Sequence, residues 1–135
     1  MKIPVEAHVA VIDGERFILF RNGSDAERPD LGSPSHPDLD PTNRSQGKMR
    51  HSITTNQEAG NDLDEAAHVA AAADWLNHAV LTHKIDNLII VADKRSLGEL
   101  RRHYHKELKD RLVGEVGKAL TNASTADIAE AILAA

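Results

Sequence analysis

The segment that most constrains the fold is an unbroken apolar run, Leu88 to Ala92, which the charged tripeptide Asp93-Lys94-Arg95 ends abruptly. Because the run has no polar alternation, it predicts a strand with both faces covered by other parts of the chain. Ser96, followed three residues later by Glu99, has the pattern of a capping box and predicts the start of a helix. A strand, a charged turn and a helix form the unit whose carboxyl end often holds a ligand in open α/β sheets. The same pattern is also typical of a central core strand with a polar turn and no site.

The composition indicates a single domain with an aliphatic core. The chain has 135 residues, and we expect residues 1–135 to form one domain. Aromatic residues make up only 3% of the chain, so Ala, Val, Leu and Ile must build the core. The absence of cysteine excludes disulfides and thiolate chemistry. No segment approaches the length of a membrane span and no export signal is evident, so we expect a cytoplasmic protein without membrane insertion. The net charge of −5 argues against general adhesion to nucleic acid and leaves room for a local basic patch.

The first part of the chain predicts a β-hairpin. Two runs of β-forming residues, Val5 to Ile12 and Arg16 to Arg21, flank the dipeptide Asp13-Gly14. This dipeptide is typical of a two-residue type I′ turn, which requires positive φ at both positions. We expect His8, on the first strand, to be half-buried.

Residues 22–61 show no apolar period and predict a long, flexible loop. They hold four of the five prolines. An unstructured loop of about 40 residues is rare in a compact domain and is usually either functional or disordered. Its middle is basic, with Arg44, Lys48 and Arg50 followed by His51. This pattern suits contacts with phosphates, and it suits a solvated linker with a chance charge cluster equally well.

The remaining segments predict helices alternating with strands. Leu63 to His83 and Leu97 to Leu108 carry apolar residues at helical spacing. Leu112 to Leu120 alternates and contains two glycines, which favours a short strand over a continuation of the preceding helix. Residues 126–134 predict a last helix. This order predicts an α/β fold in which helices flank a mixed β-sheet.

The helix that follows the central strand is basic on the face opposite its apolar stripe. From Lys94 to Arg111, seven Lys or Arg residues oppose three acids, for a net charge of +4. Such charge segregation indicates an anionic partner, although a solvated helix face explains it as simply. His103 and His105 are two residues apart and do not share a helix face, so we expect no metal site, and no motif indicates a cofactor. The candidate nucleic-acid-binding residues are therefore Arg44, Lys48, Arg50, His51, Lys94, Arg95, Arg101 and Arg102.

Three groups of residues together resemble a known family. They are residues 8–16 leading to 19–22, the pair Arg50-His51, and the run 88–92 before Leu97-Gly98-Glu99-Leu100-Arg101. On these residues the chain resembles the bacterial host attachment protein family, also described as protein required for attachment to host cells. That family is similar to the middle domain of archaeal and eukaryotic peptide-chain release factors. The resemblance implies a ribonuclease-H-like α/β fold and, as partner, the ribosome or RNA.

The long loop departs from the release-factor pattern. In release factors the loop after the first hairpin carries a Gly-Gly-Gln tip that enters the peptidyl-transferase centre. The sequence here contains no Gly-Gly-Gln, and the nearest match is Ser45-Gln46-Gly47. The resemblance therefore does not extend to hydrolysis of peptidyl-tRNA. Metal-dependent nuclease chemistry needs several converging carboxylates, of which the sequence suggests only Asp13 and Asp93.

Three functions remain open on these observations. The first is a non-enzymatic RNA- or ribosome-binding module related to release factors. The second is a cytoplasmic protein-interaction component that influences attachment to host cells. The third is a hydrolase, which would require Asp13, His51 and Asp93 to lie near one cleft.

Overall fold

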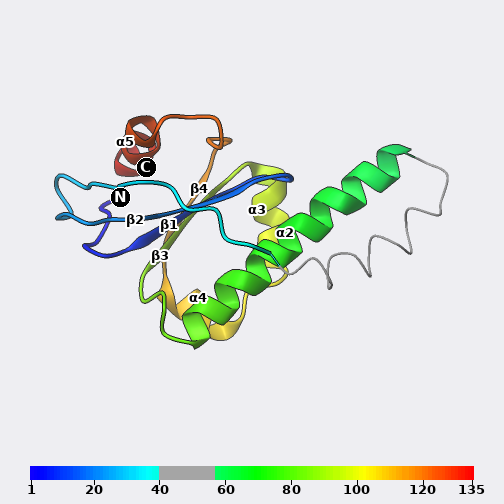
Figure 1. Cartoon of the computed structure of the whole chain (residues 1–135), viewed down its shortest axis with the longest axis horizontal. Helices are drawn as coiled ribbons and strands as arrows, with labels where there is room; N and C mark the ends of the chain where they lie inside the picture. The colour runs from blue at the N-terminus through cyan, green and yellow to red at the C-terminus, as the bar shows by residue number, and fades with distance from the viewer. Residues whose placement is uncertain (40–56) are drawn as a thin grey trace.

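A four-stranded mixed sheet forms the centre of the computed structural model, which describes residues 1–39 and 57–135, with side chains from Asp64 onward in the second range. The strand order is β2-β1-β3-β4 (Figure 1). The strands are β1 (His8–Ile12), β2 (Phe17–Arg21), β3 (Leu88–Ala92) and β4 (Leu112–Gly117). β1 is antiparallel to β2 and parallel to β3, and β3 is parallel to β4. The prediction of a mixed sheet flanked by helices is confirmed, as is the strand that was predicted within Leu112 to Leu120.

Helices cover both faces of the sheet. They are α2 (Gln57–Leu81), α3 (Lys94–Arg101), α4 (Lys106–Arg111) and α5 (Thr125–Ala134). α2, α3 and α4 pack on one face through an aliphatic core that includes Leu76, Leu100 and Leu108. α5 packs on the other face through Ile128 and Ile132 (Figure 1).

The β3 strand is the most deeply buried element, as its apolar run predicts. All five of its residues are buried. Leu88, Ile90 and Ala92 belong to the core beneath α2, whereas Ile89 and Val91 belong to the core beneath α5. A strand covered on both faces has no polar position, which explains the absence of alternation.

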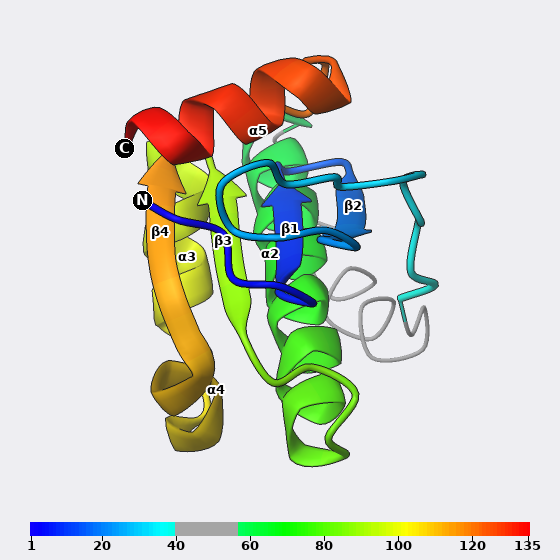
Figure 2. The same ribbon diagram turned by 90° about the vertical axis from the view of Figure 1, so that its left-hand side faces the viewer.

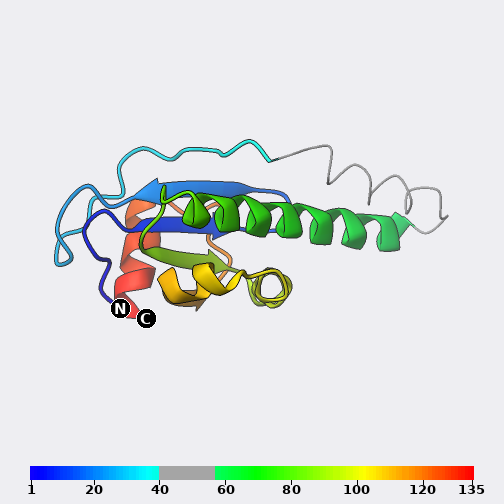
Figure 3. The ribbon, with the colours of Figure 1, turned by 90° about the horizontal axis from the view of Figure 1, so that it is seen from below.

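The α2 helix is longer than the sheet beneath it. It begins at Gln57 instead of the predicted Leu63, so residues 57–61 belong to this helix and not to the predicted loop. A helix of 25 residues is roughly 37 Å long, whereas a strand of five residues spans roughly 17 Å. The N-terminal turns of α2 therefore project beyond the carboxyl ends of β1 and β3 (Figures 1 and 3). Buried Ala72, Ala73 and Ala79 let the rest of α2 lie close to the sheet.

The hairpin is present, but the predicted type I′ turn is wrong. Ile12 pairs with Phe17, which leaves a loop of residues 13–16. Gly14 is not among the residues with positive φ. Asp13 instead organises the loop, because its Oδ1 accepts hydrogen bonds from the backbone N–H of Glu15 (2.7 Å) and Arg16 (2.6 Å).

The basic helix predicted after β3 is two helices, because a contact with α2 interrupts it. Asn77 of α2 donates its Nδ2 to the carbonyl oxygen of His103 (2.8 Å), and its Oδ1 accepts from the N–H of His105 (2.9 Å). These bonds satisfy backbone groups that a continuous helix would pair internally. His105 then caps α4 by accepting from the N–H of Glu107 at its Nδ1.

The described part of the predicted loop, residues 22–39, is anchored at two points. The side chain of Asn22 is fully buried and hydrogen-bonds to five backbone groups of the surrounding turns. Leu19 and Ser35 then exchange two backbone hydrogen bonds, N–H to O, of 2.8 and 2.9 Å. The segment thereby covers part of the outer edge of β2 and gives this side of the sheet a fixed border.

Candidate functional site

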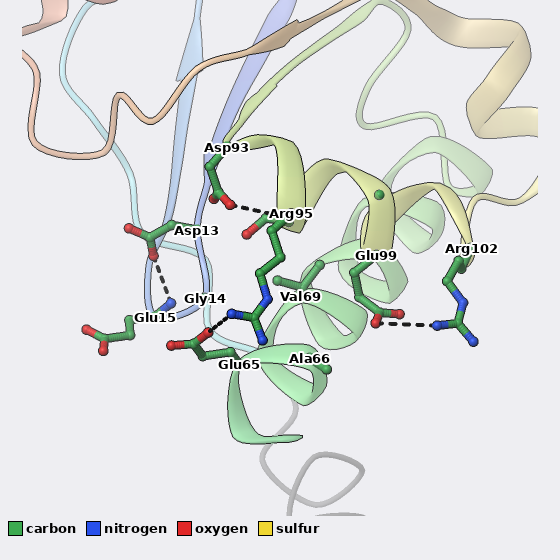
Figure 4. Close-up of a pocket in the computed structure, with 12 residues that line it drawn as sticks. Asp13, Gly14, Glu15, Glu65, Ala66, Val69, Asp93, Arg95, Glu99 and Arg102 are labelled. Atoms are coloured by element: carbon green, nitrogen blue, oxygen red, sulfur yellow. Dashed lines mark hydrogen bonds and ion pairs between the residues drawn. The ribbon is translucent and has the colours of Figure 1, made fainter. Parts of the chain in front are cut away.

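A cleft of about 500 Å³ opens at the carboxyl ends of β1 and β3 (Figure 4). Three elements form its walls: the hairpin loop with Asp13, the exposed end of α2 with Glu65, and α3 with Arg95 and Arg102. This is the edge of an open α/β sheet at which ligands usually bind. It is also the position at which the strand, charged turn and helix around β3 predict a ligand.

The cleft is acidic. Its lining carries five carboxylates, those of Asp13, Glu15, Glu65, Asp93 and Glu99, against the guanidinium groups of Arg95 and Arg102. Nη1 of Arg95 lies 3.9 Å from Oε2 of Glu65, and Nη1 of Arg102 lies 3.8 Å from Oε1 of Glu99 (Figure 4). Both cations thus lie near a carboxylate, and the lining has three more carboxylates than guanidinium groups.

Asp13, at the end of β1, is held by hydrogen bonds to its own loop and to the segment before α5. Its Oδ2 accepts from the hydroxyl of Thr121 at 2.6 Å. Burial raises the pKa of Asp13, but the hydrogen bonds from Thr121, Glu15 and Arg16, together with the charge of Arg16, outweigh burial and bring the pKa below its ordinary value. The Asp13 carboxylate is therefore ionised and serves the local structure.

Asp93, at the end of β3, caps α3. Its Oδ2 accepts from the N–H of Ser96 at 3.1 Å, and the helix begins at Lys94. The predicted capping box with Ser96 as the cap is therefore wrong, because Ser96 is buried inside the first turn. Asp93 satisfies an N–H that the helix leaves unpaired and places a negative charge at the positive end of its dipole. Glu99 instead contacts His103, with Oε2 3.0 Å from Nε2.

Two of the three residues of the hydrolase hypothesis share this cleft. Asp13 and Asp93 both line it, whereas His51 lies outside the described residues. Within residues 1–39 and 57–135, no group of three or more His, Asp or Glu side chains is arranged to hold a metal ion.

The four predicted cations of α3 divide between two sides of that helix. Lys94 and Arg101 are seven residues apart, which is two turns, and both face β4. Lys94 lies beside Gly117 of that strand, and Arg101 forms a bidentate ion pair with Glu115. Arg95 and Arg102 lie on the other side and line the cleft. The cations of α3 therefore do not form one continuous basic patch.

The ion pair of Arg101 belongs to a network that ties α3 to β4. Nη2 of Arg101 lies 2.9 Å from Oε1 of Glu115, and the hydroxyl of Tyr104 donates to Oε2 of Glu115 at 2.8 Å. Burial raises the pKa of Tyr104, and the hydrogen bond to Glu115 raises it further. Tyr104 is partly buried and packs against the core beneath α2, and sequence patterns missed the role of Glu115. The one signal available was that Glu115 is the only acid between Leu112 and Leu120.

The four remaining candidate residues, Arg44, Lys48, Arg50 and His51, lie outside the described residues, as does Ser45-Gln46-Gly47. Their assignment to nucleic-acid binding stays a prediction from the sequence.

A model of the family described as bacterial archaeo-eukaryotic release factor family 12 matches residues 6–132. The chain belongs to this family. The match spans the hairpin, the cleft, α2, α3, α4 and most of α5, and it agrees with the release-factor resemblance and with the mixed α/β sheet. Membership in release factor family 12 indicates a translation-related module, and it does not extend to attachment to host cells. No curated protein matches the chain.

The described helices of this family member include no candidate for a membrane span. In the two described ranges, no helix is both long enough and apolar enough to cross a bilayer.

Proposed function

We propose that this member of release factor family 12 is a non-enzymatic module that binds RNA on the ribosome. The single observation that carries the proposal is the family match over residues 6–132, which includes the basic segment with Arg44, Lys48, Arg50 and His51. Ribosomes present dense arrays of phosphate, and a basic segment with a glycine is suited to follow a phosphate backbone.

The shape of the described fold supports this proposal. The chain re-enters the described fold at Gln57, the first residue of α2, and this end of the helix projects beyond the strands (Figure 3). In the sequence, the basic segment precedes this end of the helix.

The ion pairs of the α3 arginines assign a lesser role to this helix. Arg95, Arg101 and Arg102 each lie within ion-pair distance of a glutamate, although 57–76% of each arginine side chain is exposed. An exposed ion pair contributes only about 0–1 kcal/mol, so these arginines can exchange a glutamate for a phosphate at low cost. We expect the basic segment to supply most of the affinity and α3 to supply additional contacts.

Co-sedimentation of the full chain with ribosomes across a salt series tests the proposal. Replacing Arg44, Lys48 and Arg50 together by glutamate should abolish association. Charge-neutralising glutamines at the same positions should lower the slope of log K against log salt by about 2 to 3, since each lost phosphate contact removes about 0.7–0.9. A matched control replaces Lys106, Lys109 and Arg111, three exposed cations of α4, by glutamine. This control has the same change in net charge and should retain most of the binding. Loss of binding in both triple variants to the same degree, or no binding at low salt, would refute the proposal.

Indirect influence on attachment to host cells, through a protein partner, is a second candidate that rests on the host attachment resemblance alone. It predicts a stable protein complex that survives high salt. Detection of the protein on intact cell surfaces would contradict the predicted location.

A further inference from the structure

A second cavity, of about 380 Å³, lies at the opposite edge of the sheet. It is formed where α2 ends and where β1 and β3 begin, and Figure 2 shows these three ends at the lower side of the sheet. The side chains that carry charge or can gain it there are Glu6, His8, Arg21, His83, Lys84 and Asp86. No motif in the sequence points to this edge, and the proposed ribosome-binding function makes no use of it.

Two residues of this cavity hold strained backbone conformations. Glu6 (φ 64°) and His83 (φ 62°) are the non-glycine residues with positive φ in the described ranges, and both line the cavity. His83 ends α2 in a Schellman arrangement, in which the N–H of Lys84 bonds to the carbonyl of Ala79 at 2.8 Å. Glycine is the residue that takes this position without strain. An ionisable side chain at such a position costs stability and suggests a role for the side chain itself.

Several polar groups around the cavity lack a partner within the described chain. Nδ1 of His8 is buried and has no hydrogen-bond partner there. The side chains of His83 and Lys84 form no hydrogen bond or ion pair with any described residue, and neither does that of Asp86. Arg21 differs, because its Nη2 lies 2.9 Å from Oε1 of Glu6. The exposed side chains of Lys84 and His83, which can donate hydrogen bonds, and that of Asp86, which can only accept them, thus line one space together with His8.

We propose that this cavity binds a phosphate-class oxyanion that carries a proton, either inorganic phosphate or the monoanion of a phosphate monoester, which forms at about pH 6 and below. The ammonium group of Lys84 and the imidazoles of His83 and His8 suit the charged oxygens of such a ligand. The carboxylate of Asp86 suits its P–OH group, which donates a hydrogen bond. Sulfate carries no proton near neutral pH, so Asp86 would repel it, and the site should select phosphate over sulfate.

The electrostatics of His8 provide an independent readout. Burial lowers the pKa of His8, the charge of Arg21 lowers it further, and Asp86 and Glu6 act in the opposite direction. The charges of Arg21 and Lys84 balance those of Glu6 and Asp86, so protonation of His8 makes the site net positive. A bound anion should therefore raise the pKa of His8, and phosphate affinity should increase as the pH falls through this raised pKa.

Isothermal titration of the full chain with sodium phosphate and sodium sulfate, at equal ionic strength, tests the proposal. We expect phosphate to bind at least tenfold more tightly than sulfate. Lys84→Gln should weaken phosphate binding about tenfold or more, whereas Lys109→Gln on α4 should not change it. His83→Gly should weaken binding and raise the melting temperature, because glycine relieves the positive φ. In an NMR titration, phosphate should move the midpoint of His8 to higher pH.

A nucleoside 5′-monophosphate identifies the source of the phosphate group. Tighter binding than inorganic phosphate would support a phosphate monoester as the ligand, and equal binding would support free phosphate. Equal affinity for sulfate and phosphate, or phosphate binding unchanged in both Lys84→Gln and His83→Gly, would overturn the proposal. Since His83→Gly is expected to stabilise the fold, its loss of binding cannot be attributed to unfolding.

Discussion

Replacing Asn22 by alanine should destabilise the protein by roughly 3–4 kcal/mol. The side chain of Asn22 is fully buried, and it satisfies backbone groups on both sides of the hairpin base. Nδ2 donates to the carbonyl oxygens of Ile3 (3.0 Å), Pro4 (3.2 Å) and Asp25 (3.3 Å), and Oδ1 accepts from the N–H groups of Ser24 (3.0 Å) and Asp30 (2.9 Å). One asparagine thus joins the N-terminal segment to the described segment 22–39.

The size of the expected loss depends on whether water can hydrogen-bond to the backbone groups that Asn22 leaves unpaired. Only the bond to Ile3 is fully buried, and leaving its carbonyl unpaired costs about 1–2 kcal/mol. The other four bonds are partly buried, and we assign about 0.5 kcal/mol to each because water can reach their backbone partners. The sum is about 3–4 kcal/mol, a large part of the stability of a typical domain.

Asn22→Asp separates hydrogen bonding from packing, because the two side chains have nearly the same shape. The carboxylate would face the carbonyl oxygens of Ile3 and Pro4, so burial and repulsion should raise its pKa in the folded state. A raised pKa means that the folded state binds more protons than the unfolded state between the two pKa values. The loss of stability relative to the native protein should therefore be smallest below about pH 4 and should grow as the pH rises towards the folded pKa.

Urea denaturation followed by circular dichroism, at several pH values, measures these free energies. Asn122→Ala is the matched control, because Asn122 is exposed and makes one side-chain hydrogen bond, to Arg16. It should change the free energy of unfolding by less than about 1 kcal/mol. A loss below about 1 kcal/mol for Asn22→Ala, or a pH-independent loss for Asn22→Asp, would refute the reasoning.

Three further substitutions test the packing around the cleft by the same measurement. Asp13→Asn should destabilise the protein at pH 7, and the difference in the free energy of unfolding should vanish as the pH falls below about 4. The hydrogen bonds that lower the pKa of Asp13 stabilise the fold only while its carboxylate is ionised. A pH-independent difference would contradict this. Gly14→Ala should cost about 1–3 kcal/mol, since the added Cβ would lie 2.9 Å from Cβ and 2.8 Å from Cγ of Glu65. Adding Glu65→Ala should recover part of that loss, and no recovery would argue against a steric cause. Ile90→Ala should cost about 2–5 kcal/mol by leaving a cavity in β3, and a loss under 1 kcal/mol would mean that the sheet closes around the gap.

The elements with a strong local pattern were predictable from the sequence. The apolar run of β3 required cover on both faces, and the two β-forming runs beside Asp13-Gly14 required a hairpin. The paired glycines after Leu112 favoured the strand that became β4. Each of these patterns depends on neighbours within a few residues, so the α/β class could be derived before any tertiary contact was known.

The arrangement of charged groups was not predictable in the same way. The cations of α3 form a single cluster in the sequence, but Glu115 and Glu65 pair with Arg101 and Arg95 on opposite sides of the helix. The cap of α3 is Asp93 and not the predicted Ser96. Several nearby side chains can accept a hydrogen bond from the first N–H groups of this helix, and the orientation of the chain leaving β3 selects one of them.

The sequence by itself determined where this chain buries apolar residues, and hence its strands, its main helices and its fold class. The tertiary structure alone decided that Asn22 joins the N-terminal segment to segment 22–39, that the cleft at the carboxyl edge is acidic, and that Glu6, His83 and Asp86 meet at the amino edge. The physical reason is the separation along the chain of the residues that make each kind of contact. Apolar periodicity reflects contacts between an element and whatever layer covers it, whereas a polar site depends on which distant residues the strand order and the crossovers bring together.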